Sequence, residues 1–315
     1  MSAIRIEGLQ KNYGGVRAVD GLNLSVEEGA IFGFLGPNGA GKTTTIRLLT
    51  GLAHPSGGQA WVAGASLGDS RKVAGRIGYL PEEPAFYTWM SPLEFLDHVG
   101  RLFGLSSAAR KARAMELLEM AGLAQVRKRR IAGFSRGMRQ RLGLAQALVN
   151  RPEVLLLDEP VSALDPAGRK EVLEMIGGLR GQCTVFMSTH ILSDVERTCD
   201  TVGIINHGKL VVEAKQQELL ARYTLPVFEL ECDPGQEAAL RALVDALSGC
   251  SWVTKTSLEG NVARILVKNV TGDRPILLGA VVRSGLALRR FEIVTPSLED
   301  VFLRLVEQDG KAVQP

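Results

Sequence analysis

Residues Gly36–Thr44 read GPNGAGKTT, which is a G-x-x-x-x-G-K-[ST] phosphate-binding loop. The apolar run Ile31–Leu35 before the loop predicts a short buried strand. The apolar spacing over Thr44–Thr50 predicts a helix that stops at Gly51. Backbone N–H groups of such a loop turn inward around phosphate oxygens, and the helix directs its N-terminal dipole at the same anion. The order strand, loop, helix therefore predicts a nucleoside triphosphate site in an α/β fold.

Two loop residues carry polar side chains with specific expected tasks. The ammonium group of Lys42 is expected to pair with the β- and γ-phosphates, and the hydroxyl of Thr43 is expected to ligate Mg²⁺. The other loop residues expected to contact the nucleotide are Gly36, Pro37, Asn38, Gly39, Ala40, Gly41 and Thr44. A glycine-rich turn that binds nothing is the alternative, and the complete set of fixed positions disfavours it.

The length and charge of the chain limit the classes of function. A chain of 315 residues predicts two domains. The formal net charge is +3, with lysine and arginine spread along the sequence, so we expect no nucleic-acid partner. The one basic run is Arg127–Arg130, for which a solvated loop is favoured over a contact with anionic lipid or phosphate.

Cysteine spacing and apolar runs indicate the compartment. The four cysteines include no C-x-x-C pair, which argues against a zinc site or a redox motif and favours a reduced, cytoplasmic setting. No apolar run approaches the ~20 residues that a membrane span needs, and the first residues lack the pattern of a signal peptide. We therefore expect a soluble chain that reaches a membrane only through a partner.

Short strands and helices alternate up to about Tyr223, which predicts an α/β domain over residues 1–223. Between Pro92 and Val149 the strand signals vanish and helical patterns replace them, so we expect a helical subdomain at about residues 84–150. The predicted strands are Ile4–Leu9, Leu22–Val26, Ile31–Leu35, Ile77–Leu80, Val154–Leu157, Cys183–Ser188, Val202–Asn206 and Lys209–Glu213. The predicted helices of the block are Pro92–Phe103, Ala108–Ala121 and Arg136–Val149.

Residues 224–315 carry a different pattern and predict a small α+β domain with no catalytic motif. Its expected order of elements is βαββαβ, the ferredoxin-like pattern, with a hairpin turn at Glu259–Asn261. The expected elements are Pro226–Glu231, Gln236–Leu247, Trp252–Ser257, Ala263–Val267, Arg274–Ser284, Ala287–Ile293 and a final helix at Ser297–Glu307.

A second nucleotide-binding element is the segment Val154–Glu159, which reads VLLLDE. Its four apolar residues predict a buried strand, and ligands of open α/β sheets bind where the strands end. Asp158 is expected to hold Mg²⁺, and Glu159 to polarise a water for in-line attack on the γ-phosphate. A strand that merely ends in two acids and turns at Pro160 is the alternative, which the phosphate loop disfavours.

Over about residues 3–220 the chain resembles the ATP-binding subunit of an ABC transporter. The motifs that carry the resemblance, in the order of that family, are Tyr13 (adenine stacking), Gly36–Thr44 (phosphate loop), Ile77–Glu82 (approach to the Q-loop), Phe134–Met138 (signature), Val154–Glu159, Ser162–Asp165 (D-loop) and His190 (switch histidine). The resemblance implies that ATP and Mg²⁺ are the cofactors. It also implies that two such subunits close head to tail over two nucleotides.

The signature segment has both a local and a family interpretation. Ser135 is a natural N-cap, and the free N–H groups of the helix that follows favour an anion. The resemblance implies that Ser135 and Gly137 bind the γ-phosphate of ATP held by the other subunit. A capped helix that binds no ligand is the alternative.

Two further positions depend on the resemblance for their roles. His190 follows a strand next in order to the Asp158–Glu159 strand, so it can hydrogen-bond the γ-phosphate and help to hold the attacking water. Tyr13 matches the residue that stacks on adenine, although a tyrosine near Gly14-Gly15 also suits the edge of a sheet.

The chain departs from the family pattern in two places. Glu82 stands where glutamine is usual, and its carboxylate can still contact Mg²⁺ while adding negative charge near the phosphates. In the signature, Arg136 replaces glycine and Met138 replaces glutamine, whereas Ser135 and Gly137 are retained. The sequence leaves open whether Arg136 reaches a phosphate or only solvent.

Two segments bear on the partner. Phe86, Tyr87 and Trp89 precede the helical block, where the resemblance implies a groove for a short helix of the membrane permease; core packing is the alternative. Thr295–Phe302, TPSLEDVF, resembles the close of exporter ATPases whose permease is a separate chain, and Ser297 with Asp300 also suits a helix start.

The sequence therefore predicts an ATPase subunit of an ABC exporter that works as a homodimer or heterodimer. Its expected place is the cytoplasmic face of the membrane, held by a permease. A soluble ABC-type ATPase acting on ribosomes or DNA is the alternative. The single phosphate loop disfavours the ribosomal class, and the short interval from Thr44 to Phe134 leaves no room for the coiled coils of DNA-repair relatives. A regulatory module without turnover is disfavoured by Glu159 and His190.

Overall fold

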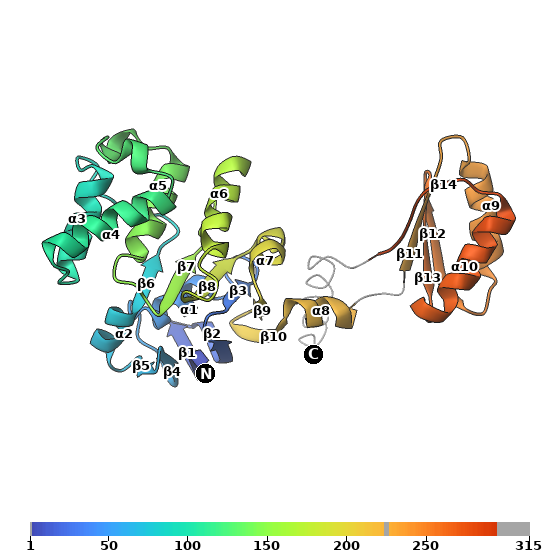
Figure 1. The fold of residues 1–315 in the computed structure, drawn as a ribbon. Helices are drawn as coiled ribbons and strands as arrows, with labels where there is room; N and C mark the ends of the chain where they lie inside the picture. Colours follow the sequence, from blue (N-terminus) through green and yellow to red (C-terminus); the bar gives the residue numbers. More distant parts are fainter. Residues whose placement is uncertain (1, 224–226, 295–315) are drawn as a thin grey trace. The chain divides into compact units, whose positions relative to one another are not determined.

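The computed structural model describes residues 2–223 and 227–294 (Figure 1). These residues separate into two compact units, one up to Gln216 and one from Gln217 onward. The predicted final helix Ser297–Glu307 and the segment Thr295–Phe302 lie outside the described residues.

A six-stranded sheet forms the centre of the first unit in the described chain, in the order β10-β9-β3-β8-β7-β6. Its strands are β3 (Ile31–Leu35), β6 (Ile77–Leu80), β7 (Val154–Asp158), β8 (Thr184–Thr189), β9 (Thr201–Asn206) and β10 (Lys209–Lys215). All pair in parallel except β10, which is antiparallel to β9. Every residue of β3, β7 and β8 is buried, as expected for apolar strands covered on both faces.

An antiparallel sheet covers one face of this parallel sheet. It has the order β2-β1-β4-β5, with β1 (Ser2–Tyr13), β2 (Val16–Glu27), β4 (Gly57–Val62) and β5 (Ala65–Ser66). The core between the sheets also holds Phe32, Phe34 and Phe186. The ring centroid of Phe186 lies 5.4 Å from that of Phe32 and 5.1 Å from that of Phe34. Strand β4 was not predicted, because it begins with two glycines, which have no side chains to show the alternation of a strand.

Helices fill both sides of the parallel sheet. Ile46, Leu48 and Leu49 of α1 (Lys42–Leu49) join the same core as Phe32 and Phe34. Side chains alternate along a strand, so Gly33 of β3 points to the opposite face. There a Cβ at Gly33 would lie 2.8 Å from Val195, which places α7 (Leu192–Thr198) directly against the strand.

Three helices form the block predicted between Pro92 and Val149, and no strand interrupts it in the described chain. They are α3 (Pro92–Leu102), α4 (Ser107–Met120) and α5 (Arg136–Ala147), with 3₁₀ turns at Ala124–Val126 and Ile131–Gly133. Ser91 and Glu94 form a capping box at the start of α3, and Pro92 occupies its first turn. Helices α2 (Ser70–Arg76) and α6 (Pro166–Gly177) were not predicted; Asp69 and Asp165 cap them.

The second unit confirms the predicted order βαββαβ. After α8 (Gln216–Tyr223) come β11 (Val227–Cys232), α9 (Glu237–Ser248), β12 (Val253–Glu259), β13 (Val262–Val267), α10 (Val270–Ser284) and β14 (Leu288–Ile293). The sheet order β12-β13-β11-β14 inserts a strand into each βαβ unit, which is the split βαβ of the ferredoxin-like pattern. Helix α10 begins at Val270, earlier than the predicted Arg274, because Asn269 accepts hydrogen bonds from two backbone N–H groups.

Within the two described ranges, no helix combines the length and the apolar character needed to cross a bilayer.

Candidate functional site

The phosphate loop connects β3 to α1, and its glycines are required for different reasons. Gly39 has φ +81° and Gly41 has φ +108°, backbone conformations that other residues rarely adopt. A Cβ at Gly36 would lie 2.4 Å from the carbonyl oxygen of Ile205, and one at Gly41 would lie 2.3 Å from that of Ala18. The loop therefore keeps its tight path only with glycine at these positions.

Lys42 is buried at the first position of α1 and is only 5% exposed. Its Nζ donates to the carbonyl oxygens of Gly36, at 2.8 Å, and Pro37, at 3.2 Å. The same nitrogen lies 3.4 Å from Oε1 of Glu159. A cation held by the loop backbone thus faces a carboxylate from the end of a different strand.

Asp158 and Thr43 form the second contact across the site. Oδ1 of Asp158 accepts hydrogen bonds from the hydroxyl of Thr43, at 3.0 Å, and from the hydroxyl of Ser188, at 2.7 Å. Asp158 pairs with Ser188 in the register of β7 with β8. Hydroxyl and carboxylate oxygens are ligands that suit Mg²⁺, which usually takes one or two protein oxygens and completes its shell with phosphates and water. The described residues hold no cluster of three or more His, Cys, Asp or Glu side chains that could bind a metal.

Glu159 lies between a cation and a histidine. It is 7% exposed, and while Oε1 faces Lys42, Oε2 lies 3.0 Å from Nδ1 of His190. Its φ of +46° is unusual for a residue with a side chain, and its N–H is held by Ser188. Such local strain persists only where the surroundings enforce it, and it is common at functional sites.

These residues line a cleft of about 330 Å³. Glu82 lies there and accepts a hydrogen bond from the Ser162 hydroxyl at 3.3 Å. The described residues that line the cleft are Ala18, Asn38, Gly39, Gly41, Lys42, Thr43, Thr44, Glu82, Glu159, Ser162 and His190. Burial, and after it the negative charge of Asp158, raise the pKa of Tyr79.

Seven predicted residues are not among the described residues that line this cleft: Gly36, Pro37, Ala40 and Asp158, which adjoin it, and Tyr13, Ser135 and Gly137. Tyr13 is 49% exposed at the end of β1, with the Lys11 ammonium 4.9 Å from the centre of its ring. Ser135 caps α5 as expected, because its Oγ accepts from the N–H of Met138 at 3.2 Å. Ser135 is exposed and Gly137 is half-buried, and neither lines the cleft beside the chain's own phosphate loop.

Neither Ser188 nor a contact of Ser162 was predicted from the sequence. Ser188 holds both Asp158 and the backbone of Glu159. The available signal was its position near the end of the strand that precedes His190, because parallel strands bring their carboxyl ends to one edge.

Aromatic side chains line a groove of about 360 Å³ at the helical block. Phe86 packs edge-on against Phe95 with ring centroids 5.2 Å apart. Trp89, which is 66% exposed, contacts Tyr87 and lies beside the groove rather than among the described residues that line it. The lining residues are Ala85, Phe86, Tyr87, Phe95, His98, Val99, Leu102 and Gln146.

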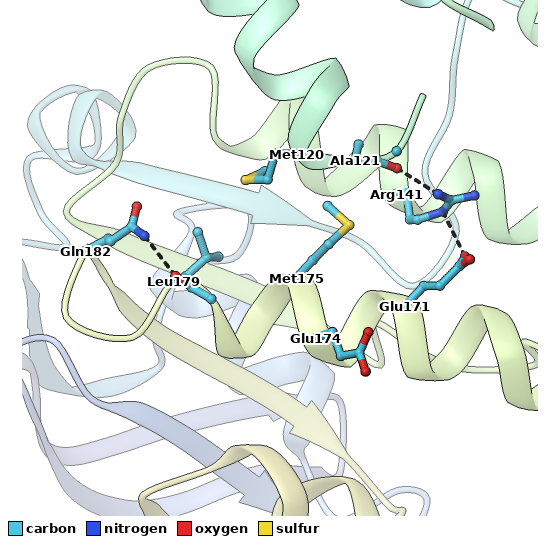
Figure 2. Close-up of a pocket in the computed structure, with 10 residues that line it drawn as sticks. Met120, Ala121, Arg141, Glu171, Glu174, Met175, Leu179 and Gln182 are labelled. Carbon is cyan, nitrogen blue, oxygen red and sulfur yellow. Dashed lines mark hydrogen bonds and ion pairs between the residues drawn. The ribbon is translucent and has the colours of Figure 1, made fainter. Parts of the chain in front are cut away.

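A cavity of about 490 Å³ lies elsewhere in the first unit, where the end of α4 meets α5 and α6 (Figure 2). Arg141 crosses it, donating to the carbonyl oxygen of Ala121 at 2.8 Å and placing Nε 3.4 Å from Glu171. Met120 and Met175 line it from opposite helices. No lining residue is shared with the phosphate-loop cleft, so Arg141 serves here as a tie between the helical block and α6.

Comparisons with known proteins cover both units. A family model described as ABC transporter matches residues 19–162, and one described as the C-terminal domain of DrrA1-3-like ATP-binding proteins matches residues 215–306. The uncharacterized ABC transporter ATP-binding protein YxlF of Bacillus subtilis is 42% identical, covering 96% of this chain and 99% of the relative. The daunorubicin resistance ATP-binding protein DrrA3 of Streptomyces coeruleorubidus is 36% identical over 98% of each chain. A solved ATP-binding subunit of an ABC transporter is 28% identical with a TM-score of 0.64, covering 70% of this chain and 93% of the other.

Proposed function

The chain belongs to the ATP-binding proteins of ABC transporters, and we propose that it hydrolyses Mg-ATP as a dimer to drive export through a separate membrane permease. ATP hydrolysis itself is the activity of this family. The observation that carries the proposal is that two residues distant in sequence meet at Glu159. Nζ of Lys42 lies 3.4 Å from Oε1 of Glu159, and Nδ1 of His190 lies 3.0 Å from Oε2.

Each residue of the cleft has a task in this proposal. Lys42 pairs with the β- and γ-phosphates, and Thr43 with Asp158 holds the Mg²⁺ that neutralises charge on the phosphates. The carboxylate of Glu159 accepts a proton from the attacking water, and His190 orients that water and the γ-phosphate. Glu82 contacts the same region and links it to Ser162. Tyr13 stacks on the adenine at the rim.

The N-terminus of α5, exposed at Ser135 and outside the chain's own phosphate-loop cleft, supports a dimer. In the proposed arrangement, Ser135 and Gly137 of one subunit bind the γ-phosphate held by the phosphate loop of the other. Free N–H groups at a helix start favour such an anion. One chain carries both half-sites, which permits a homodimer, and a heterodimer with a related ATPase subunit uses the same contacts.

Gly137→Asp is expected to weaken ATP-driven dimerisation strongly while each subunit still binds ATP. The added carboxylate lies at the helix start that receives the γ-phosphate, and like charges repel there by several kcal/mol at close range. Light scattering with Mg-ATP should show at least about tenfold weaker association. The control is Ala108→Asp, which adds a carboxylate near the exposed start of α4. Dimerisation of Gly137→Asp at the level of the control contradicts the proposal.

The exporter role has support from the second unit and from one full-length relative. The second unit matches the C-terminal domain of DrrA-type proteins, and one full-length relative is named for resistance to daunorubicin. In this proposal, the permease holds the chain at the cytoplasmic face of the membrane. The aromatic groove, with Trp89 exposed beside it, is the surface that we assign to a short helix of that permease.

Photoreactive phenylalanine analogues at Tyr87 and Trp89 are expected to crosslink to the permease in membranes. Both side chains are exposed, so their replacement leaves the core intact. The matched control is Lys72, an exposed side chain on α2, which should give no permease adduct. Adducts confined to the chain itself at positions 87 and 89 contradict this assignment.

A further inference from the structure

We propose that the ion pair between Arg169 and Asp194 is a positioning device that holds His190 against Glu159 and thereby sets the rate of ATP hydrolysis. The inference rests on the proposed function, since it takes Glu159 and His190 as the hydrolytic pair. It adds two residues that lie outside the motifs of the sequence analysis.

The pair is close and almost fully desolvated on its acidic side. Nε and Nη2 of Arg169 each lie 2.6 Å from Oδ1 of Asp194, and Nη2 also donates to the Ser193 hydroxyl at 3.0 Å. Asp194 is 1% exposed, whereas Arg169 is partly exposed. The guanidinium group of Arg169 therefore binds two successive residues, Ser193 and Asp194, in the first turn of α7.

The pair joins the two segments that flank the cleft. Arg169 lies in the first turns of α6, directly after the loop Ser162–Asp165, and Ser162 lines the cleft. Asp194 follows His190 by four residues and precedes Val195, which packs over Gly33 of β3. Because Val195 fixes α7 against the sheet and Asp194 fixes it to α6, the start of α7 has no freedom to carry His190 away from Glu159.

The charges of Glu159 and His190 affect the carboxyl group of Asp194. Burial raises the pKa of Asp194, and the hydrogen bond and charge of Arg169 act against that rise; Glu159 and His190 also contribute. The reacting residues and the ion pair are therefore near enough to influence one another.

The geometry of Asp194 favours positioning over stabilisation. Its Oδ2 finds no hydrogen-bond partner among the described residues. Buried ion pairs with unsatisfied oxygens contribute little net stability, because desolvation offsets the attraction, whereas they define one arrangement of the elements they join. We infer that this pair is retained for the orientation of α7.

A second ion pair provides a matched control. Arg180, beyond the end of α6, places Nε 3.0 Å from Oδ1 of Asp200 and donates to the carbonyl oxygen of Thr198 at 2.9 Å. It ties the same two helical segments together at their far ends, away from His190. Arg180→Met therefore removes an arginine–aspartate ion pair between the same segments without touching the start of α7, although the side chains of this pair are more exposed.

The test measures the effect of Arg169→Met on steady-state ATP hydrolysis in two backgrounds, the wild-type chain and His190→Ala. Arg169→Met alone is expected to lower kcat about tenfold or more, with the KM for ATP changed by less than about twofold, because a small misplacement of a reacting group has this effect. His190→Ala is expected to lower kcat by about 10². If Arg169 acts through His190, the double variant has the kcat of His190→Ala alone, since residues that act as a unit are not additive.

Two outcomes separate the inference from the proposed function. If His190→Ala leaves kcat unchanged, the proposed role of His190 fails, and the inference fails with it. If His190→Ala lowers kcat while Arg169→Met matches Arg180→Met, or if the two losses multiply in the double variant, only the positioning role is overturned.

A paired variant keeps the test decisive if Arg169→Met does not fold. Arg169→Met/Asp194→Leu removes both charges, so no buried carboxylate is left alone. It is expected to keep the wild-type thermal midpoint within a few degrees and to retain a kcat loss of at least about fivefold. A paired variant with wild-type kcat overturns the positioning role.

Discussion

Glu159→Gln is expected to reduce ATP turnover by a factor of about 10² or more while ATP binding persists. The carboxylate is the base in the proposed reaction, and an amide of the same shape accepts no proton from water. The substitution keeps Oε1 available to Lys42 and keeps a polar group beside His190, so the cleft should retain its form. Removing the negative charge also reduces repulsion of the γ-phosphate.

This variant should also accumulate as a nucleotide-bound dimer, since hydrolysis no longer ends the dimeric state. Phosphate release measures turnover, and size-exclusion chromatography with Mg-ATP measures the dimer. Glu153→Gln is the matched control, because Glu153 immediately precedes the same strand and is exposed. Hydrolysis by Glu159→Gln at the control rate removes Glu159 from the proposed role.

Lys42→Ala is expected to weaken ATP binding by a factor of about 10². Two unit charges about 4 Å apart interact by roughly 4 kcal/mol at an effective dielectric constant of 20, and the ammonium group is the cation that the loop aims at the phosphates. Its exposed fraction of 5% means that little water screens this charge. Equilibrium titration with a fluorescent ATP analogue measures the change.

The loss of Lys42 also leaves Glu159 buried without its neighbouring cation. A lower thermal midpoint is therefore expected together with weaker binding. Lys72→Ala, at an exposed lysine of α2, controls for the removal of a positive charge. ATP affinity equal to that of the control contradicts the assignment of the loop.

The fold class followed from the sequence where local patterns are strong. The strands Ile31–Leu35 and Ile77–Leu80 were predicted with their observed bounds, because short apolar runs between glycine-rich turns admit few other structures. The second unit was predicted as βαββαβ for the same reason. The elements β4, α2 and α6 were missed, because tertiary packing and side-chain caps stabilise them more than any apolar period does.

Local sequence patterns predicted only part of the candidate site. The tasks of Lys42, Thr43, Asp158, Glu159 and His190 remain predictions, and the structure adds the distances that make them testable. Ser188 was overlooked because a serine within an apolar strand carries no motif. Its importance appears only once β7 and β8 pair and place its hydroxyl 2.7 Å from Asp158.

What the sequence by itself determined is the path of the phosphate loop. Lys42 bonds to Gly36 and Pro37 within a few residues, and the glycines supply the required backbone angles, so the information is local. What only the tertiary structure decided is which residues face the loop. The strand β8 lies between β3 and β7, and this order brings Glu159 to Lys42 and Arg169 to Asp194. Strand order depends on long-range burial of both sheet faces, which no short stretch of sequence contains.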